Sequence, residues 1–369
     1  VEAVSFCPPN NVHPTITIDA LRAGKNVLCE KPAARTYKEA LEMQKVQHET
    51  GKVLNIGVVN RFNDSVNLIK KYIDDGKLGD VYHVYASFRA HRSIPGLGGA
   101  FTTKEIAGGG ALIDWGVHYL DIVMYCCGDP KVKTVTGEVF SKLGVDMKGY
   151  AYKDMWAGPP KYDGVYDVDD SVVGMIRTDG PVISLHGAWA QNIGVAEQYI
   201  DFIGDKAGIR LQYGKDFTVY TAEHGALVEY KPEFKMRDHF QNEIDAFINC
   251  IKTGEKLPSH IDTVIITAQM VLECVFLPKV GAGGNADDAG DLRFLRTAQG
   301  DRPRRISRGR PSQISRKGLF SMYPFSIGVL MDGFRTDTLT ALDKAAAVGA
   351  KGIQVYATKG ELSPENMNA

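Results

Sequence analysis

Short apolar runs alternate with amphipathic stretches over residues 1–59. Each apolar run has the length of a buried strand, and each amphipathic stretch repeats its apolar positions at helical spacing. Gly24 and Gly51 stand where the two helices should end. The predicted strands are 1–6, 27–29 and 53–59, and the predicted helices pass through 16–22 and 36–50. This alternation predicts an α/β fold with a doubly wound parallel sheet over residues 1–80.

From residue 81 the pattern changes to alternation of apolar and polar positions, which is typical of half-buried strands. Helical periodicity returns in two late stretches. The predicted strands are 81–90, 134–140, 171–177, 182–189, 197–203, 209–213 and 217–221, and the predicted helices are 240–252 and 261–274. Runs of strands after a strand–helix unit predict an α+β domain over residues 81–276, built on an open antiparallel sheet.

Beyond residue 276 the periodicity is lost. We predict an irregular basic linker over 277–321, where residues 301–317 include seven arginines or lysines and one acid. A short run of positive charge is usually solvated, and nucleic-acid binding by this run is the alternative. Apolar periodicity returns in 322–369, where a strand, a helix and a second strand are predicted at 325–331, 336–348 and 352–357.

The whole chain has almost no net charge, with 43 lysines and arginines against 44 aspartates and glutamates. We therefore expect no nucleic-acid partner and no attachment to an anionic membrane. The longest apolar stretch, 264–277, contains polar residues and is too short to span a bilayer. Six cysteines without zinc-type spacing predict reduced thiols, no metal site and a cytoplasmic protein.

Two turns that follow predicted strands carry polar residues. Pro9, Asn10 and His13 follow the first strand, at the end where doubly wound sheets bind ligands. A Pro-Pro-Asn turn is also ordinary loop chemistry. Lys31 stands before Pro32 after the second strand. A lysine held in a cleft can bind a substrate hydroxyl and favour its alkoxide, and a solvated loop lysine is the alternative.

The stretch 107–121 carries three consecutive glycines, followed by Asp114 and His118. Residues four apart on an α-helix share one face, with about 5–6 Å between their Cβ atoms. The pair therefore predicts a histidine acid/base that is oriented by a carboxylate. The glycines predict a close approach of the backbone to a ligand. A surface ion pair is the alternative for any single Asp-x-x-x-His pair.

In this order, the three groups of residues resemble the Gfo/Idh/MocA oxidoreductases, relatives of glucose-fructose oxidoreductase and inositol dehydrogenase. The resemblance covers residues 1–276 and implies a partial Rossmann domain over residues 1–80, with its first strands missing. It also implies a catalytic set of Lys31, Asp114 and His118. It also implies an NAD or NADP cofactor, whose nicotinamide end is lined by Pro9, Asn10, His13, Glu30, Lys31, Pro32, Asn60 and Arg61. The exposed sheet of the second domain is expected to pair with another subunit, giving a homo-oligomer.

The function implied is hydride transfer from a secondary alcohol of a sugar or cyclitol to the nicotinamide. The histidine would take the hydroxyl proton, the aspartate would orient the imidazolium, and the lysine would polarise the substrate oxygen. Trp156, Trp189 and Asn192 are further candidates for the border of the substrate site, although tryptophan in such strands more often belongs to the core.

Two other functions stay open. Some family members retain NAD and oxidise a sugar transiently, which supports glycoside cleavage or epimerisation. A non-catalytic fragment or sugar-binding module is the other alternative, because no G-x-G-x-x-G turn for the pyrophosphate precedes Val1. We therefore expect an oxidoreductase truncated at its amino end. The one similar sequence, G-x-G-x-x-A at 281–286, is followed by no periodic helix.

Residues 322–369 have a resemblance of their own. They resemble the opening strand–helix–strand unit of a TIM-barrel sugar-phosphate isomerase or epimerase. The expectation is that this incomplete unit is the start of a neighbouring gene, joined to the oxidoreductase through the irregular linker.

Overall fold

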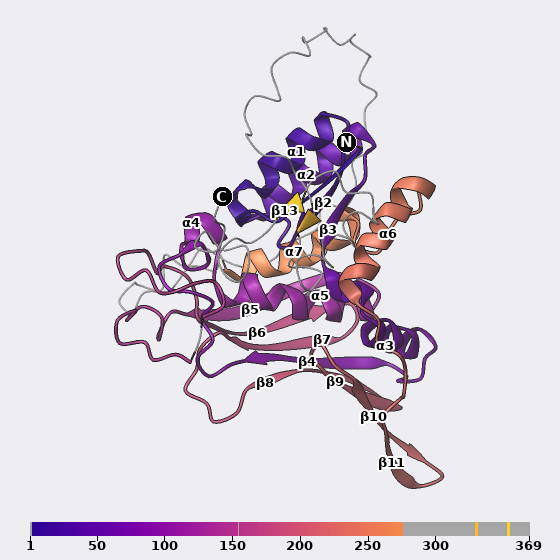
Figure 1. Ribbon diagram of the computed structural model, residues 1–369. Coiled ribbons are helices and arrows are strands. Elements are labelled where there is room, and N and C mark those ends of the chain that lie inside the picture. Colours follow the sequence, from indigo (N-terminus) through magenta and orange to yellow (C-terminus); the bar gives the residue numbers. More distant parts are fainter. Residues whose placement is uncertain (1, 154, 276–328, 331–352, 355–369) are drawn as a thin grey trace, which may run out of the picture.

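The computed structural model describes residues 2–153, 155–275, 329–330 and 353–354, and its first sheet is fully parallel (Figure 1). The strands, in spatial order, are β1 (Ala3–Phe6), β2 (Asn26–Glu30) and β3 (Leu54–Gly57). Helices α1 (His13–Arg22) and α2 (Tyr37–Thr50) connect them. This Rossmann-like sheet confirms the predicted doubly wound fold. The three carboxyl ends lie at one edge, where such sheets bind ligands.

Local signals explain where α2 begins and ends. The Thr36 hydroxyl accepts the backbone N–H of Glu39 at 3.2 Å, and the Glu39 carboxylate accepts that of Thr36 at 3.0 Å. This reciprocal capping box satisfies two amide groups that the first helical turn leaves unpaired. Gly51 adopts a φ of +63°, the left-handed conformation that ends a helix at little steric cost.

The second sheet has eight strands in the order β11-β10-β9-β8-β4-β7-β6-β5. Their bounds are β4 (Val81–Arg89), β5 (Val132–Phe140), β6 (Ser171–Thr178), β7 (Val182–Ala188), β8 (Glu197–Gly204), β9 (Ala207–Gln212), β10 (Phe217–Glu223) and β11 (Ala226–Tyr230). All neighbouring pairs are antiparallel except β4 and β7. The predicted sheet is therefore confirmed as mostly antiparallel. The parallel pair arises because the long connection after β4 takes the chain to the edge strand β5. The antiparallel strands β5, β6 and β7 then lead back to β4, so that β7 lies beside β4 in the same direction.

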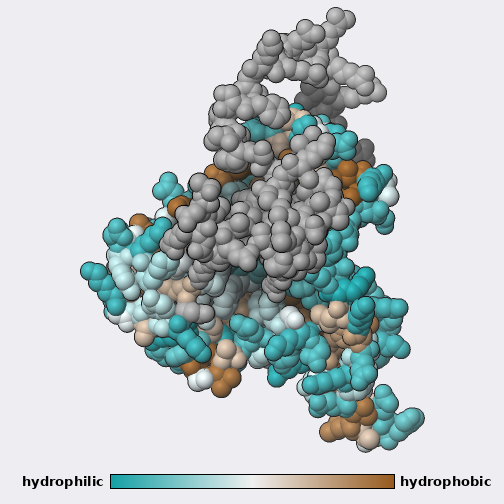
Figure 2. All heavy atoms as spheres, in the orientation of Figure 1, coloured by the Kyte–Doolittle hydropathy of each residue, from teal (hydrophilic) through white to brown (hydrophobic). Residues whose placement is uncertain are grey.

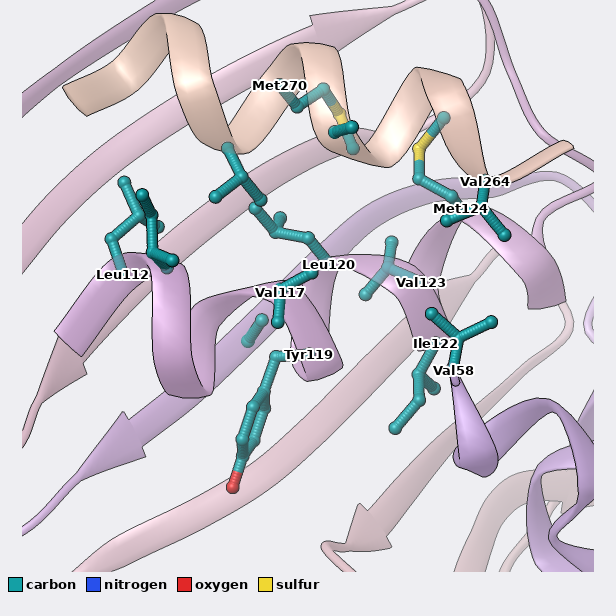
Figure 3. Packing of buried hydrophobic residues seen from close by; sticks show 14 of the residues in the cluster. Val58, Leu112, Val117, Tyr119, Leu120, Ile122, Val123, Met124, Val264 and Met270 are labelled. Atoms are coloured by element: carbon teal, nitrogen blue, oxygen red, sulfur yellow. The ribbon is translucent and has the colours of Figure 1, made fainter. Parts of the chain in front are cut away.

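Helices cover one face of this sheet and leave the other face open (Figure 1). Helix α5 (Val117–Cys126) packs on β4, and α7 (Ile261–Val275) packs on α5 and also contacts β3 and α2. Val264 and Met270 of α7 face α5, while Tyr119 points from α5 toward the sheet (Figure 3). One continuous apolar core thus joins the two sheets.

The remaining helices are α3 (Asp64–Asp74), α4 (Lys104–Ala107) and α6 (His239–Thr253). The structure confirms the late helices as α6 and α7, and it adds α3 and β11 to the predicted elements. Two short strands, β12 (Val329–Leu330) and β13 (Ile353–Gln354), pair in parallel and fall within the strands predicted for the tail. The predicted linker and the helix at 336–348 lie outside the described residues. Within the described parts, no helix has the length and apolar character needed to cross a membrane.

Candidate active site

His13 ties together the turns that follow β1 and β2. Its Nδ1 lies 2.8 Å from the carbonyl oxygen of Pro32, and its Nε2 lies 2.9 Å from that of Pro8. The side chain is buried, so it holds the two turns together from behind. Asn10 donates from its amide to the carbonyl of Ala107 at 2.8 Å, which fixes the first turn against α4.

Lys31, at the end of β2, forms an ion pair with Asp114. Its Nζ lies 3.0 Å from both the Oδ1 and the carbonyl oxygen of Asp114, and the second carboxylate oxygen accepts the indole N–H of Trp189 at 3.2 Å. The side chains of Lys31 and Asp114 are 17% and 11% exposed, so the pair is shielded but reaches the surface. Burial opposes the charge on Lys31, but the carboxylates of Asp114 and Glu30 outweigh it and raise the pKa.

Asp114 lies in a π turn (Leu112–Gly116), not in a regular α-helix. The N–H of Val117 donates to the carbonyl of Leu112, which places one extra residue in the turn before α5. Because of that residue, the α-helical rule for positions four apart does not apply here. Both oxygens of Asp114 are taken by Lys31 and Trp189, and the described residues show no hydrogen bond between Asp114 and His118. The prediction that Asp114 orients His118 is therefore corrected: its partner is Lys31.

His118 instead contacts a pair of residues from two other elements. The Asn60 amide nitrogen lies 3.4 Å from His118 Nδ1 and donates to the Tyr213 hydroxyl at 3.2 Å. Burial lowers the pKa of His118 well below its ordinary value, and the positive charge of Lys31 lowers it further. His118 is therefore neutral at neutral pH, which a proton acceptor must be.

Of the three glycines before the π turn, Gly109 and Gly110 lie against Asp169, while Gly108 lies against Arg35. The backbone N–H groups of Gly110 and Leu112 donate to the Asp169 carboxylate at 2.7 and 3.0 Å. A Cβ on Gly110 would lie 1.8 Å from the carbonyl oxygen of Asp169. The glycines were predicted to let the backbone approach a ligand. At Gly110 the close neighbour is instead the backbone of Asp169. Asp169 therefore anchors the turn that carries Asp114.

Glu30 lies beneath the Lys31 backbone. Its half-buried side chain accepts the N–H of Lys31 at 3.0 Å, and desolvation raises the pKa of the carboxyl group. Gly57 leaves room for it, because a Cβ there would lie 3.0 Å from the carboxyl group. The Lys31–Pro32 peptide bond is cis.

This donor set fits the nicotinamide end of NAD or NADP. The Lys31 ammonium and the Asn60 amide stand after β2 and β3 and would supply hydrogen-bond donors to the ribose hydroxyls and the carboxamide of such a cofactor. Pro9 opens a single 3-10 turn after β1 at the same edge. The sequence 281–286 lies outside the described residues.

Arg61 is placed apart from the other predicted site residues. Its guanidinium donates to both carboxylate oxygens of Asp121 at 2.9 and 2.7 Å, and to the carbonyl of Pro258 at 2.7 Å. The side chain is 1% exposed, so it lies in the core behind the strand ends. Its predicted place beside the cofactor therefore has no support in the geometry.

The aromatic and amide candidates for the substrate border separate in the same way. Trp189 reaches Asp114, as described above, and is fully buried. Trp156 is exposed and meets Phe101 edge to face at 4.9 Å, while Asn192 accepts a hydrogen bond from Arg92 at 2.8 Å. The structure therefore joins Trp189 to the site, and places the other two in surface contacts.

Tyr213 and Asp169 are site residues that sequence reasoning did not find. Tyr213 is 153 positions from Asn60, and Asp169 is 59 positions from Gly110, so no local spacing connects either residue to its partner. The sole sequence signal was indirect, since three consecutive glycines indicate a close approach without naming what approaches.

Comparison with known proteins gives family matches over both sheets. Residues 1–58 match the oxidoreductase family model with an NAD-binding Rossmann fold, and residues 66–210 match the GFO/IDH/MocA C-terminal domain.

Two curated relatives and a solved structure are similar to the chain. It is 34% identical over 275 residues to D-glucoside 3-dehydrogenase of Escherichia coli, covering 73% of this chain and 75% of that enzyme. It is 31% identical over 208 residues to levoglucosan dehydrogenase of Pseudarthrobacter phenanthrenivorans, covering 55% of this chain and about half (52%) of that enzyme. A levoglucosan dehydrogenase complex with NADH and levoglucosan shares the fold, with a TM-score of 0.62, 22% identity and coverage of 74% and 78%.

Proposed function

The chain belongs to the Gfo/Idh/MocA family of oxidoreductases, and from that membership we propose that it oxidises a secondary alcohol of a sugar or cyclitol with NAD or NADP. The observation that carries the proposal is the meeting of a lysine–aspartate pair and a neutral histidine beside the ends of β2 and β3. A fixed cation and a proton acceptor are the two groups that removal of a hydroxyl proton requires.

The side chains divide this work between them. The Lys31 ammonium donates to the hydroxyl oxygen and stabilises it as its proton leaves, and His118 takes that proton. Asp114 holds Lys31 in place, with Trp189 bound to its second oxygen. The nicotinamide supplies the acceptor for the hydride that leaves the same carbon, so that the alcohol becomes a ketone.

The proposed wall for the nicotinamide end consists of Pro9, Asn10, Glu30, Lys31, Pro32 and Asn60. These residues follow the three parallel strands at one edge of the sheet. His13 joins two of the turns from behind, and Arg61 supports the third from the core through Asp121.

Within the substrate class, we propose a D-glucopyranoside that is oxidised at C3. The support is the name of the Escherichia coli relative, a D-glucoside 3-dehydrogenase, which matches over 73% of this chain.

The test mixes the 369-residue chain with NAD+ or NADP+ and either methyl β-D-glucopyranoside or myo-inositol, and follows reduced nicotinamide. The wild type should turn over, and His118→Gln should lower kcat by about 10²–10⁴-fold, the usual contribution of a general acid/base. Tyr82→Phe, on an exposed β4 side chain, is the control and should change nothing. A folded chain that binds neither cofactor by isothermal titration would contradict the proposal.

We also propose that the open face of the eight-stranded sheet joins copies of this chain into a homo-oligomer. Tyr85, Val173, Met175 and Tyr220 lie exposed on it, and Met175, Ser184 and Tyr85 occupy one row across three strands. Exposed apolar side chains gathered on one sheet face favour association. A separate hydrophobic cap lies at the tip of the β10–β11 hairpin, where Leu227 is 94% exposed (Figure 2).

A further inference from the structure

The connection between β5 and β6, residues 141–170, carries a group of exposed apolar side chains. Five of them are at least 40% exposed: Val145, Tyr152, Trp156, Tyr162 and Val165. Trp156 is the most exposed of these, at 57%. Single apolar side chains are common on any protein surface, but several on one segment indicate a binding surface. Trp156 is also a sequence candidate for the substrate border to which the proposed reaction gives no role.

The indole of Trp156 is held in place by the ring of Phe101. The two rings meet edge to face, with 4.9 Å between their centroids and 73° between their planes. Phe101 lies in a short 3-10 turn (Ala100–Thr102) on the connection after β4, so the pair joins two separate connections. Next to Trp156, the N–H of Ala157 donates to the carbonyl of Pro95 at 2.9 Å. A ring pair that is already fixed binds a further apolar group at a low cost in conformational entropy.

The same two connections lead to the proposed catalytic residues. The Ser93 N–H donates to the Trp189 carbonyl at 2.8 Å, and the Trp189 indole donates to Asp114 at 3.2 Å. Helix α4 follows Phe101 in the chain and is bound by Asn10 from the turn after β1. Figure 1 shows the connections as loops beside α4. The ring pair therefore lies on the α4 side of the candidate site.

A glucoside that is oxidised at C3 must place its aglycone, the group on C1, outside the catalytic set. C1 and C3 are separated by one ring carbon, and the equatorial oxygens on them diverge. With the C3 hydroxyl at Lys31 and His118, the aglycone points away from both side chains. The carboxyl ends of β1–β3 are the proposed wall for the nicotinamide. The loops on the α4 side are left to receive the aglycone.

We propose that Phe101 and Trp156 form an aglycone subsite for an aromatic ring, so that the chain prefers aryl β-D-glucopyranosides to alkyl ones. This inference rests on the proposed function, because it assumes a glucoside held by Lys31 and His118. An aromatic aglycone extends the edge-to-face pair to a third ring, and such contacts are favourable beyond the area that they bury. A second sugar ring in the same place would bring hydroxyl groups that need hydrogen-bond partners, whereas a phenyl ring brings none.

The first experiment measures binding without turnover. Phenyl or methyl β-D-glucopyranoside is titrated calorimetrically into the full chain with NADH, NADPH or no cofactor, conditions in which no hydride acceptor is present. The phenyl glucoside should have a Kd about tenfold lower, the size expected when one face of a phenyl ring leaves water. Trp156→Ala should remove this difference, and Trp156→Phe should keep most of it. Tyr82→Ala, at an exposed aromatic position on β4, is the matched control and should keep all of it.

Three results of this titration would overturn the proposal. They are the same Kd for both glucosides, a preference for phenyl that survives in Trp156→Ala, and a phenyl glucoside that does not bind. Because Trp156 is exposed, its replacement should leave the fold intact, which the unfolding midpoint in urea checks.

The second experiment separates KM from kcat, using both glucosides with NAD+ or NADP+. Trp156→Ala should raise KM for the phenyl glucoside about tenfold and leave kcat, and KM for the methyl glucoside, unchanged. Phe101→Leu should act in the same direction with a smaller effect. Equal losses for both glucosides would mean a structural role and refute the inference. Wild type that binds the phenyl glucoside through Trp156 but oxidises neither compound would refute the proposed function and support the subsite.

Discussion

The Lys31 ammonium is held at 3.0 Å by both the carboxylate and the carbonyl of Asp114, and this pairing changes the role that spacing predicts for the aspartate. Lys31, Asp114 and His118 are all candidates from sequence, Lys31 from the turn after a predicted strand and the other two from the stretch that follows three glycines. Their pairing was not predicted, because it depends on a π turn and on Trp189, which approaches from another strand. Arg61 is the opposite case. It follows β3 at the predicted edge of the sheet, but its side chain points into the core and not toward the site.

Replacing Asp114 should therefore act on the lysine. In Asp114→Asn the ammonium loses its ionic partner, and the pKa of Lys31 should fall because burial is no longer opposed by that carboxylate. We expect kcat to fall by about 10²-fold, with a new decline in activity at alkaline pH as Lys31 loses its proton. Rate profiles from pH 6 to 10 for both proteins measure this. If the alkaline limb of the rate profile were the same in both proteins, the result would contradict the pairing of Asp114 with Lys31 and favour its pairing with His118.

The lowered pKa of His118 predicts the acid side of the rate profile. His118 stays unprotonated until the pH falls below its depressed pKa, so the acid limb of kcat/KM for oxidation should lie below about 6.5, the ordinary histidine value. The unfolded chain binds this proton at a higher pH than the folded chain does. As the pH is lowered through about 6.5, the free energy of unfolding should therefore decrease more steeply in wild type than in His118→Gln. An acid limb above pH 7 would contradict the burial of His118.

At the scale of elements, the periodicity of the sequence predicts the strands and the long helices. It does not predict the irregular elements, such as the π turn. Gly51, which ends α2, and the capping box at Thr36 are local signals. The two ends of α2 were therefore predicted to within one residue. The π turn depends on Asp169, which lies two residues before β6 and leaves no trace in the sequence around the turn. A sequence pattern of four-residue spacing cannot show an extra residue that a distant carboxylate stabilises.

Asp169→Asn tests that anchor. The substitution removes one of two acceptors that the buried N–H groups of Gly110 and Leu112 use, and should cost about 1–3 kcal/mol in the free energy of unfolding. Urea unfolding measures the cost. Asp163→Asn, at an exposed position nearby in sequence, should stay within about 0.5 kcal/mol. Equal stability of the two variants would mean that the π turn stands without its cap.

At the scale of the whole molecule, one core joins the parallel sheet to the mixed sheet, and the candidate site lies between them. Alternating patterns predicted both sheets, but the row of exposed residues on the open face becomes visible only when strand order is known. The single parallel pair, β4 with β7, brings Tyr85 into register with Ser184 beside Met175.

A double substitution on this face tests association. Val173→Glu with Met175→Glu places charge in the middle of the proposed interface, so the chain should change from oligomer to monomer in light scattering. Leu227→Glu, at the hairpin tip away from this row, is the matched control and should keep the wild-type mass. A monomeric wild type, or an oligomer that survives the double substitution, would place the interface elsewhere.

The central claim is hydride transfer from a sugar carbon, and isotope transfer measures it most directly. The full chain is incubated with NAD+ or NADP+ and methyl β-D-glucopyranoside carrying deuterium at C3, and the nicotinamide is analysed by mass spectrometry. The account predicts deuterium in the reduced nicotinamide from wild type and its loss in His118→Gln. A cofactor that binds to the folded chain but receives no deuterium from C3 of the glucoside, nor from the carbinol carbons of a deuterated cyclitol, would contradict the account.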